Sequence, residues 1–110
     1  MSDSMITDEI RARIEAGTAV LWCAHAGSGP LCTDLVSHTA VGWLEVGRML
    51  VELGELIYLR SKMHYSLRTR PELIVRAHPG VLVIDPTVWA DIAREGPAVG
   101  IFILADTWSA

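Results

Sequence analysis

The sequence has little of several features that would point directly to one class of protein. It has two cysteines and one phenylalanine among 110 residues, and it lacks the run of roughly 18 apolar residues that a membrane span needs. Its start, MSDSMITDEIRARI, is acidic and amphipathic, so we expect no secretory signal and a cytoplasmic location without membrane attachment. A charged fraction of 20% and a hydrophobic fraction of 51% exclude a disordered chain. We therefore expect a single globular domain over residues 1–110.

The net charge and the missing motifs exclude some classes of function but identify none. The net charge of −4 argues against extensive wrapping by nucleic acid or anionic lipid. No G-x-S-x-G nucleophile elbow and no Walker lysine is present. The sequence therefore names no reaction and no cofactor, and it favours a non-enzymatic protein.

Hydrophobic periodicity predicts a helix over about 6–16. Thr7 fits its N-cap, and two acidic residues follow in the first turn, where the helix dipole favours negative charge. Ile6, Ile10 and Ile14 form a narrow apolar stripe, and Gly17 fits its end.

The rest of the chain alternates between strand and helix patterns. We expect a helix over 37–53, with Trp43, Leu44, Gly47 and Val51 on its apolar face. Residues 58–70 alternate between polar and less polar positions, which is typical of a half-exposed strand. The remaining predicted elements are strands over 18–25, 73–77, 81–84 and 99–105 and a helix over 88–95. The main hairpin turn falls either at Pro71 or at Pro79-Gly80.

After the first helix, this order of elements predicts an α+β fold. With residues 58–84 counted as two strands around one main hairpin turn, it is the β-α-β-β-α-β order of the ferredoxin-like sandwich, in which both helices cover one face of an antiparallel sheet. The other sheet face would then be apolar and uncovered. Either the N-terminal helix or a second copy of the chain must cover it, and we favour a homodimer.

A basic face is the most informative local feature. Lysine and arginine residues concentrate between residues 60 and 76 and share even parity with two histidines. On one strand face they could bind phosphate or carboxylate, because a guanidinium donates two hydrogen bonds at once. The alternative is the solvated outer face of an edge strand. The candidate binding residues are Arg60, Lys62, His64, Arg68 and Arg70.

The segment Leu21–Pro30 combines an apolar strand with a glycine-rich loop. Locally it resembles the loop that helps to form the oxyanion hole in thioesterases of the α/β-hydrolase type. The resemblance covers ten residues, and the missing G-x-S-x-G means that the activity is not carried over. We interpret the loop as a turn.

The cysteines and two histidines, Cys23, His25, Cys32 and His38, have the side chains that zinc prefers. Their spacing does not match the usual zinc motifs, so we expect no metal. Cys23 and His25 should share one strand face. In a cytoplasmic protein we expect both thiols to be reduced, with a bridge closing the 23–32 loop as the alternative.

Three functions remain open. The favoured one is a small, acidic, non-catalytic interaction module of the inhibitor or accessory type, dimeric and bound to another macromolecule. The second is a binder of an anionic small molecule or single-stranded nucleic acid through the basic face. The third is a small enzyme with a dimer cavity, using His25, His64 or His78 as acid or base.

Overall fold

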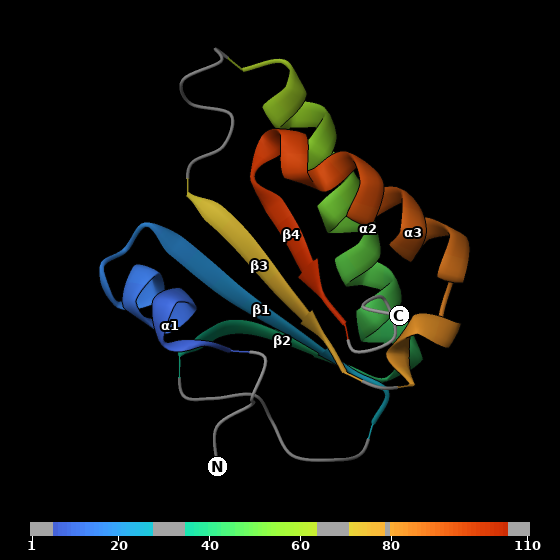
Figure 1. Ribbon diagram of the computed structural model, residues 1–110. Helices are drawn as coiled ribbons and strands as arrows, with labels where there is room; N and C mark the ends of the chain where they lie inside the picture. The colour runs from blue at the N-terminus through green and yellow to red at the C-terminus, as the bar shows by residue number, and fades with distance from the viewer. Residues whose placement is uncertain (1–5, 28–34, 64–70, 79, 106–110) are drawn as a thin grey trace.

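The computed structural model describes residues 6–27, 35–63, 71–78 and 80–105. This part of the chain contains three helices and four strands (Figure 1). In chain order the elements are α1 (Asp8–Glu15), β1 (Ala19–His25), β2 (Val36–Val41), α2 (Gly42–Ser61), β3 (Glu72–Ala77), η1 (Val81–Val83), α3 (Pro86–Glu95), η2 (Gly96–Val99) and β4 (Ile101–Leu104), where η denotes a short 3₁₀ turn.

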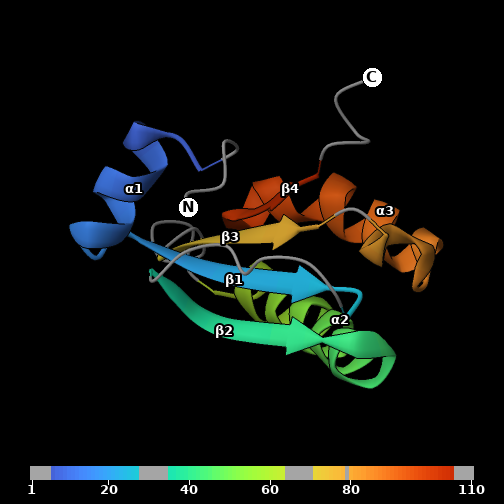
Figure 2. The ribbon, with the colours of Figure 1, turned by 90° about the horizontal axis from the view of Figure 1, so that it is seen from below.

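The sheet has the order β2-β1-β3-β4, and all three neighbouring pairs are parallel. Figure 2 shows the four strands side by side with their carboxyl ends at the same edge. The predicted antiparallel, ferredoxin-like sheet is therefore wrong. The physical reason lies in β1, whose side chains are buried or half-buried on both faces. Such continuous apolar strands are typical of parallel sheets that are covered on both sides.

Helices cover both faces of this sheet. On one face α2 and α3 pack on the strands, and the core there includes Trp89, Leu53 and Val75. On the opposite face α1 lies over β1 and β3, and its isoleucines pack against Leu21 and Ile74. Two helix layers thus enclose one parallel sheet, and α1 covers part of the face that the sequence predicted to lie at a dimer interface.

The N-terminal helix forms as predicted. The Thr7 hydroxyl accepts a hydrogen bond from the Ile10 backbone N–H at 3.3 Å, which satisfies one of the free donors of the first turn. Arg13 then ties α1 to the sheet through an ion pair of 2.6 Å with Glu72 at the start of β3. Gly17 ends the helix with a positive φ of 82°.

The second helix differs from its prediction in both position and orientation. Residues 37–41 belong to β2, and α2 then continues through Gly54 to Ser61. Its core face consists of Val46, Met49, Leu50 and Leu53, which have the i, i+3, i+4, i+7 spacing of a buried stripe. Trp43, Leu44 and Val51, predicted to face the core, are exposed.

Two predicted strands are absent from the described part of the chain. Residues 58–61 form the last turn of α2, and residues 64–70 lie outside the described ranges. Residues 81–83 form a 3₁₀ turn that follows Gly80, whose φ is 92°. The strands predicted over 73–77 and 99–105 and the helix over 88–95 are confirmed as β3, β4 and α3.

The described residues form neither predicted hairpin, because β3 pairs in parallel with both of its neighbours. Among the described helices, none is long and apolar enough to cross a membrane.

Candidate functional site

The order of the strands creates a switch point between β1 and β3. The strand that follows β1 in sequence, β2, lies on one side of this pair, whereas β4, which follows β3, lies on the other. The chain therefore leaves the carboxyl ends of β1 and β3 in opposite directions. In open sheets with parallel strands, ligands bind in the crevice outside the carboxyl ends at such a point.

Three side chains with metal-binding atoms meet at this edge. Cys23 and His25 lie two residues apart on β1 and so share one sheet face, as predicted. His78 follows the last residue of β3. Their potential ligand atoms all lie within 4.8 Å of one another. Cys23 and His25 are buried, and His78 is half-buried.

The contacts within the cluster are close. His78 Nε2 lies 3.2 Å from Cys23 Sγ. The imidazole rings of His25 and His78 stack, with their centroids 3.9 Å apart and their planes 14° from parallel. One histidine thus contacts both of the other side chains.

The backbone fixes the position of His78. Its N–H donates to the Ala24 carbonyl at 3.0 Å, which extends the β1–β3 ladder beyond the end of β3. Its carbonyl accepts a hydrogen bond from the Val81 N–H at 3.1 Å as the chain turns into η1. The residue is therefore held on both sides next to His25.

Cys23 is disulfide-bonded in this structure. The expectation of a free thiol is thus wrong for this residue. The chain has one other cysteine, Cys32, which lies outside the described residues. A disulfide sulfur is a poor metal ligand, whereas a thiolate is a strong one. The redox state of Cys23 therefore decides whether the cluster offers a thiolate donor.

Arg76 lies across from Cys23 in the β1–β3 register and is buried. Its guanidinium donates to the backbone carbonyls of Ala77 at 2.8 Å and Leu104 at 3.3 Å. These bonds turn the cation toward β4, next to the strand end where the cluster lies.

Of the five predicted binding residues, the two that the structure describes, Arg60 and Lys62, lie at the end of α2 and not on a strand. Arg60 is in the last turn of α2 and donates to the carbonyls of Val99 at 2.9 Å and Pro71 at 2.8 Å. Burial lowers the pKa of Arg60 from its usual value, but the group keeps its charge at neutral pH. Lys62 caps the same helix, and its ammonium lies 4.8 Å from the centroid of the Tyr58 ring.

The other three predicted binding residues, His64, Arg68 and Arg70, lie outside the described residues. Anion binding by these residues stays a prediction. Arg60 acts in the described structure as a clamp between α2 and the chain segments before β3 and β4.

Of the four residues considered for zinc, Cys23 and His25 lie together, His38 lies elsewhere, and Cys32 is outside the described residues. His38 pairs with Trp22 in the β1–β2 register and contacts its ring edge-on, with the centroids 5.1 Å apart. Trp22 packs toward α2, on the opposite face of β1 from Cys23. His78 was not predicted from the sequence as the third member of the cluster, because it is far from Cys23 and His25 in the sequence. The available signal was that His25 and His78 each end an apolar strand, which brings them together only in a parallel sheet.

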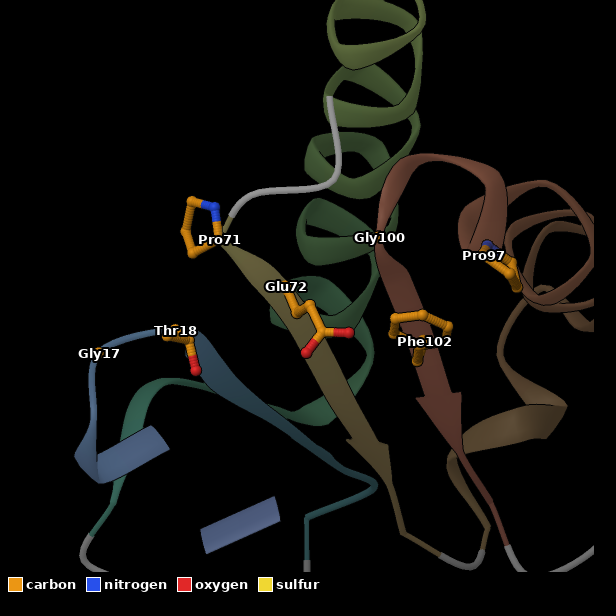
Figure 3. A pocket seen from close by; sticks show the side chains of 7 residues that line it. All are labelled: Gly17, Thr18, Pro71, Glu72, Pro97, Gly100 and Phe102. Atoms are coloured by element: carbon orange, nitrogen blue, oxygen red, sulfur yellow. The ribbon is translucent and has the colours of Figure 1, made fainter. Parts of the chain in front are cut away.

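A separate cavity lies at the opposite edge of the sheet. It has a volume of about 800 Å³ and lies at the amino ends of β3 and β4, as Figure 3 shows. Glu72 is the charged residue among those that line it, and its carboxylate is paired with Arg13. Glycines, prolines, Thr18 and Phe102 form the rest of the lining, so this cavity brings together no catalytic or metal-binding group from the described residues.

Searches among protein-family models, curated proteins and solved structures found no match to this chain. The function is therefore inferred from the chemistry of the cluster. Once Cys23 is reduced, the cluster would offer one soft thiolate and two borderline imidazoles, and this combination suits zinc, cobalt or copper better than magnesium or calcium.

Proposed function

We propose that the protein binds one transition-metal ion of the Zn²⁺ type through Cys23, His25 and His78 when Cys23 is reduced. The supporting observation is that these three donors, from two adjacent parallel strands, lie within 4.8 Å of one another at the switch point. Cys23 and His25 lie on β1, and the backbone N–H of His78 is bonded to the same strand, which limits the entropy lost on binding.

The distances fit a tetrahedral ion after a small rearrangement. With metal–ligand bonds of about 2.0–2.3 Å, the ligand atoms of a tetrahedral zinc site lie roughly 3.3–3.7 Å apart. The 3.2 Å between His78 Nε2 and Cys23 Sγ is close to this range. The stacked His25 ring needs to turn so that its nitrogen points to the same centre as the other two atoms.

Binding is coupled to the redox state of Cys23. A dithiol reductant transfers two electrons and two protons to the disulfide, which yields two protein thiols, and the reductant itself becomes a disulfide. Cys23 then releases its proton when its sulfur binds the cation. We assign this activity to the cytoplasm, where thiols are kept reduced. Three protein ligands leave one position of the ion open to water or to a small ligand.

A zinc titration in competition with a chromophoric chelator tests this function. The chain is first reduced and the reductant removed, and a second sample is kept oxidised. We expect one ion per reduced chain. Oxidation of the chain, the substitution Cys23→Ser and the substitution His78→Ala should each weaken zinc binding at least about 100-fold. Loss of a residue that only hydrogen-bonds to a metal ligand already costs about 10–100-fold in affinity, and loss of a ligand itself should cost more.

His38→Ala is the matched control, because His38 lies on the other face of β1. It should leave the affinity unchanged. Circular dichroism and thermal melting check that the variants fold, and the half-buried His78 is the substitution least disruptive to the core. Equal binding by reduced and oxidised protein, or by wild type and the folded His78→Ala variant, would contradict the proposal.

A further inference from the structure

Helix α2 has a second apolar stripe on the side that faces away from the sheet. Leu44, Val51 and Tyr58 recur at intervals of seven residues, so they line up along the helix, and Leu59 lies beside them. Their exposed fractions are 69%, 61%, 60% and 58%. We call these four residues the outer α2 stripe. Single exposed apolar residues are common, but an aligned row on one helix marks an interface.

The surface beside the stripe leaves room for another chain. Gly47 and Gly54 lie next to it, and a Cβ added at either position would meet no atom within 4 Å. Val51, Gly54, Glu55, Tyr58 and Leu59 line an open hollow of about 490 Å³. Glycines at such positions let a second helix backbone approach closely. The hollow has the size to receive aliphatic side chains.

The flanking charges indicate that the partner is a second copy in antiparallel orientation. Arg48 and Glu55 lie on either side of Val51, both are exposed, and neither forms an ion pair within the described part of the chain. A two-fold axis near Val51 would place Arg48 of each copy within one residue of Glu55 of the other, and Leu44 of each opposite Tyr58. A parallel pair would instead place Arg48 level with Arg48 and Glu55 level with Glu55, so no opposite charges would pair.

We propose that the outer α2 stripe pairs with the same stripe of a second copy, in antiparallel orientation about a two-fold axis near Val51. This interface is independent of the metal site. The sequence alone predicts a homodimer formed through the uncovered sheet face. Because α1 covers part of that face, we place the dimer interface at the outer α2 stripe instead. A two-fold axis makes each contact occur twice, so the two Arg48–Glu55 pairs form together.

The size of the contact predicts its strength. A helix of 20 residues is about 30 Å long. Pairing along its length buries several hundred Å² per copy, below the roughly 800 Å² per partner of a standard interface. The dimer should therefore form in the micromolar concentration range, in rapid exchange with the monomer.

Sedimentation equilibrium between about 1 and 200 µM tests the pairing. The wild type should approach twice the 12.0-kDa mass of the chain at the highest concentration. Val51→Glu should weaken the dimer at least about 100-fold, because it removes an apolar contact and places two carboxylates at the axis. Val83→Glu is the matched control, since Val83 is also valine, is 67% exposed and lies on η1, so its dimer should be unchanged.

Charge reversal tests the orientation. Arg48→Glu and Glu55→Arg should each weaken the dimer about 10-fold, and the double variant should restore it, because the pair is re-formed with opposite polarity. A wild type that stays monomeric at 200 µM, a dimer that survives Val51→Glu, or a double variant as weak as the single ones would overturn the proposal. Zinc binding by the Val51→Glu monomer should remain, which separates this interface from the metal site.

Discussion

Removal of the Arg60 guanidinium should destabilise the fold, because in the described structure this residue acts as a clamp and not as a ligand-binding group. Its two hydrogen bonds hold the end of α2 to Val99, before β4, and to Pro71, before β3. The bond to Val99 is partly buried and the bond to Pro71 is exposed, so we assign about 1.5 kcal/mol to the first and about 0.5 kcal/mol to the second.

Arg60→Ala should thus lower the free energy of unfolding by about 2 kcal/mol, which for a domain of this size lowers the Tm by about 8 °C. Urea unfolding followed by circular dichroism measures the effect. Arg94→Ala is the control, because the exposed pair of Arg94 with Asp91 should contribute less than about 0.5 kcal/mol. An Arg60→Ala variant as stable as Arg94→Ala would refute the clamp.

Two further substitutions test the packing. Gly96→Ala should lower the free energy of unfolding by at least about 2 kcal/mol, because a Cβ there would overlap the carbonyl oxygen of Ile101. Gly54 has open space around it, so Gly54→Ala should raise the free energy of unfolding of the dilute monomer by up to about 1 kcal/mol and weaken the dimer. Chemical unfolding at low protein concentration shows whether each substitution stabilises or destabilises the monomer. A double-mutant cycle on Arg13 and Glu72 should give a coupling of about 1 kcal/mol, since the partly exposed pair is 2.6 Å long. Zero coupling would show that the pair does not hold α1 to the sheet.

The sequence was sufficient to predict elements with strong local determinants. Thr7 and the isoleucine stripe identified α1, Pro86 and Gly96 bracketed α3, and the apolar run after Gly17 identified β1. Each of these elements carries its own signal, which is a capping residue, a turn residue at its end or a hydrophobic periodicity. Local information therefore decided the outcome.

The sequence was insufficient where tertiary context decides. The start of the predicted alternation, residues 58–61, is the last turn of a helix, and β2 is an edge strand of mixed polar and apolar residues without an apolar period. The direction of the strands was also misjudged, although β1 is apolar on both faces. The error had a direct consequence for the site. An antiparallel sheet separates the ends of β1 and β3, whereas the parallel sheet brings His25 and His78 into contact.

The most direct test of the central claim is X-ray absorption at the zinc edge of the reduced, zinc-loaded protein. The proposed site predicts one sulfur at about 2.3 Å and two imidazole nitrogens at about 2.0–2.1 Å, with one nitrogen lost in His78→Ala. A first shell of nitrogen and oxygen without sulfur, unchanged in His78→Ala, would contradict a metal site formed by Cys23, His25 and His78.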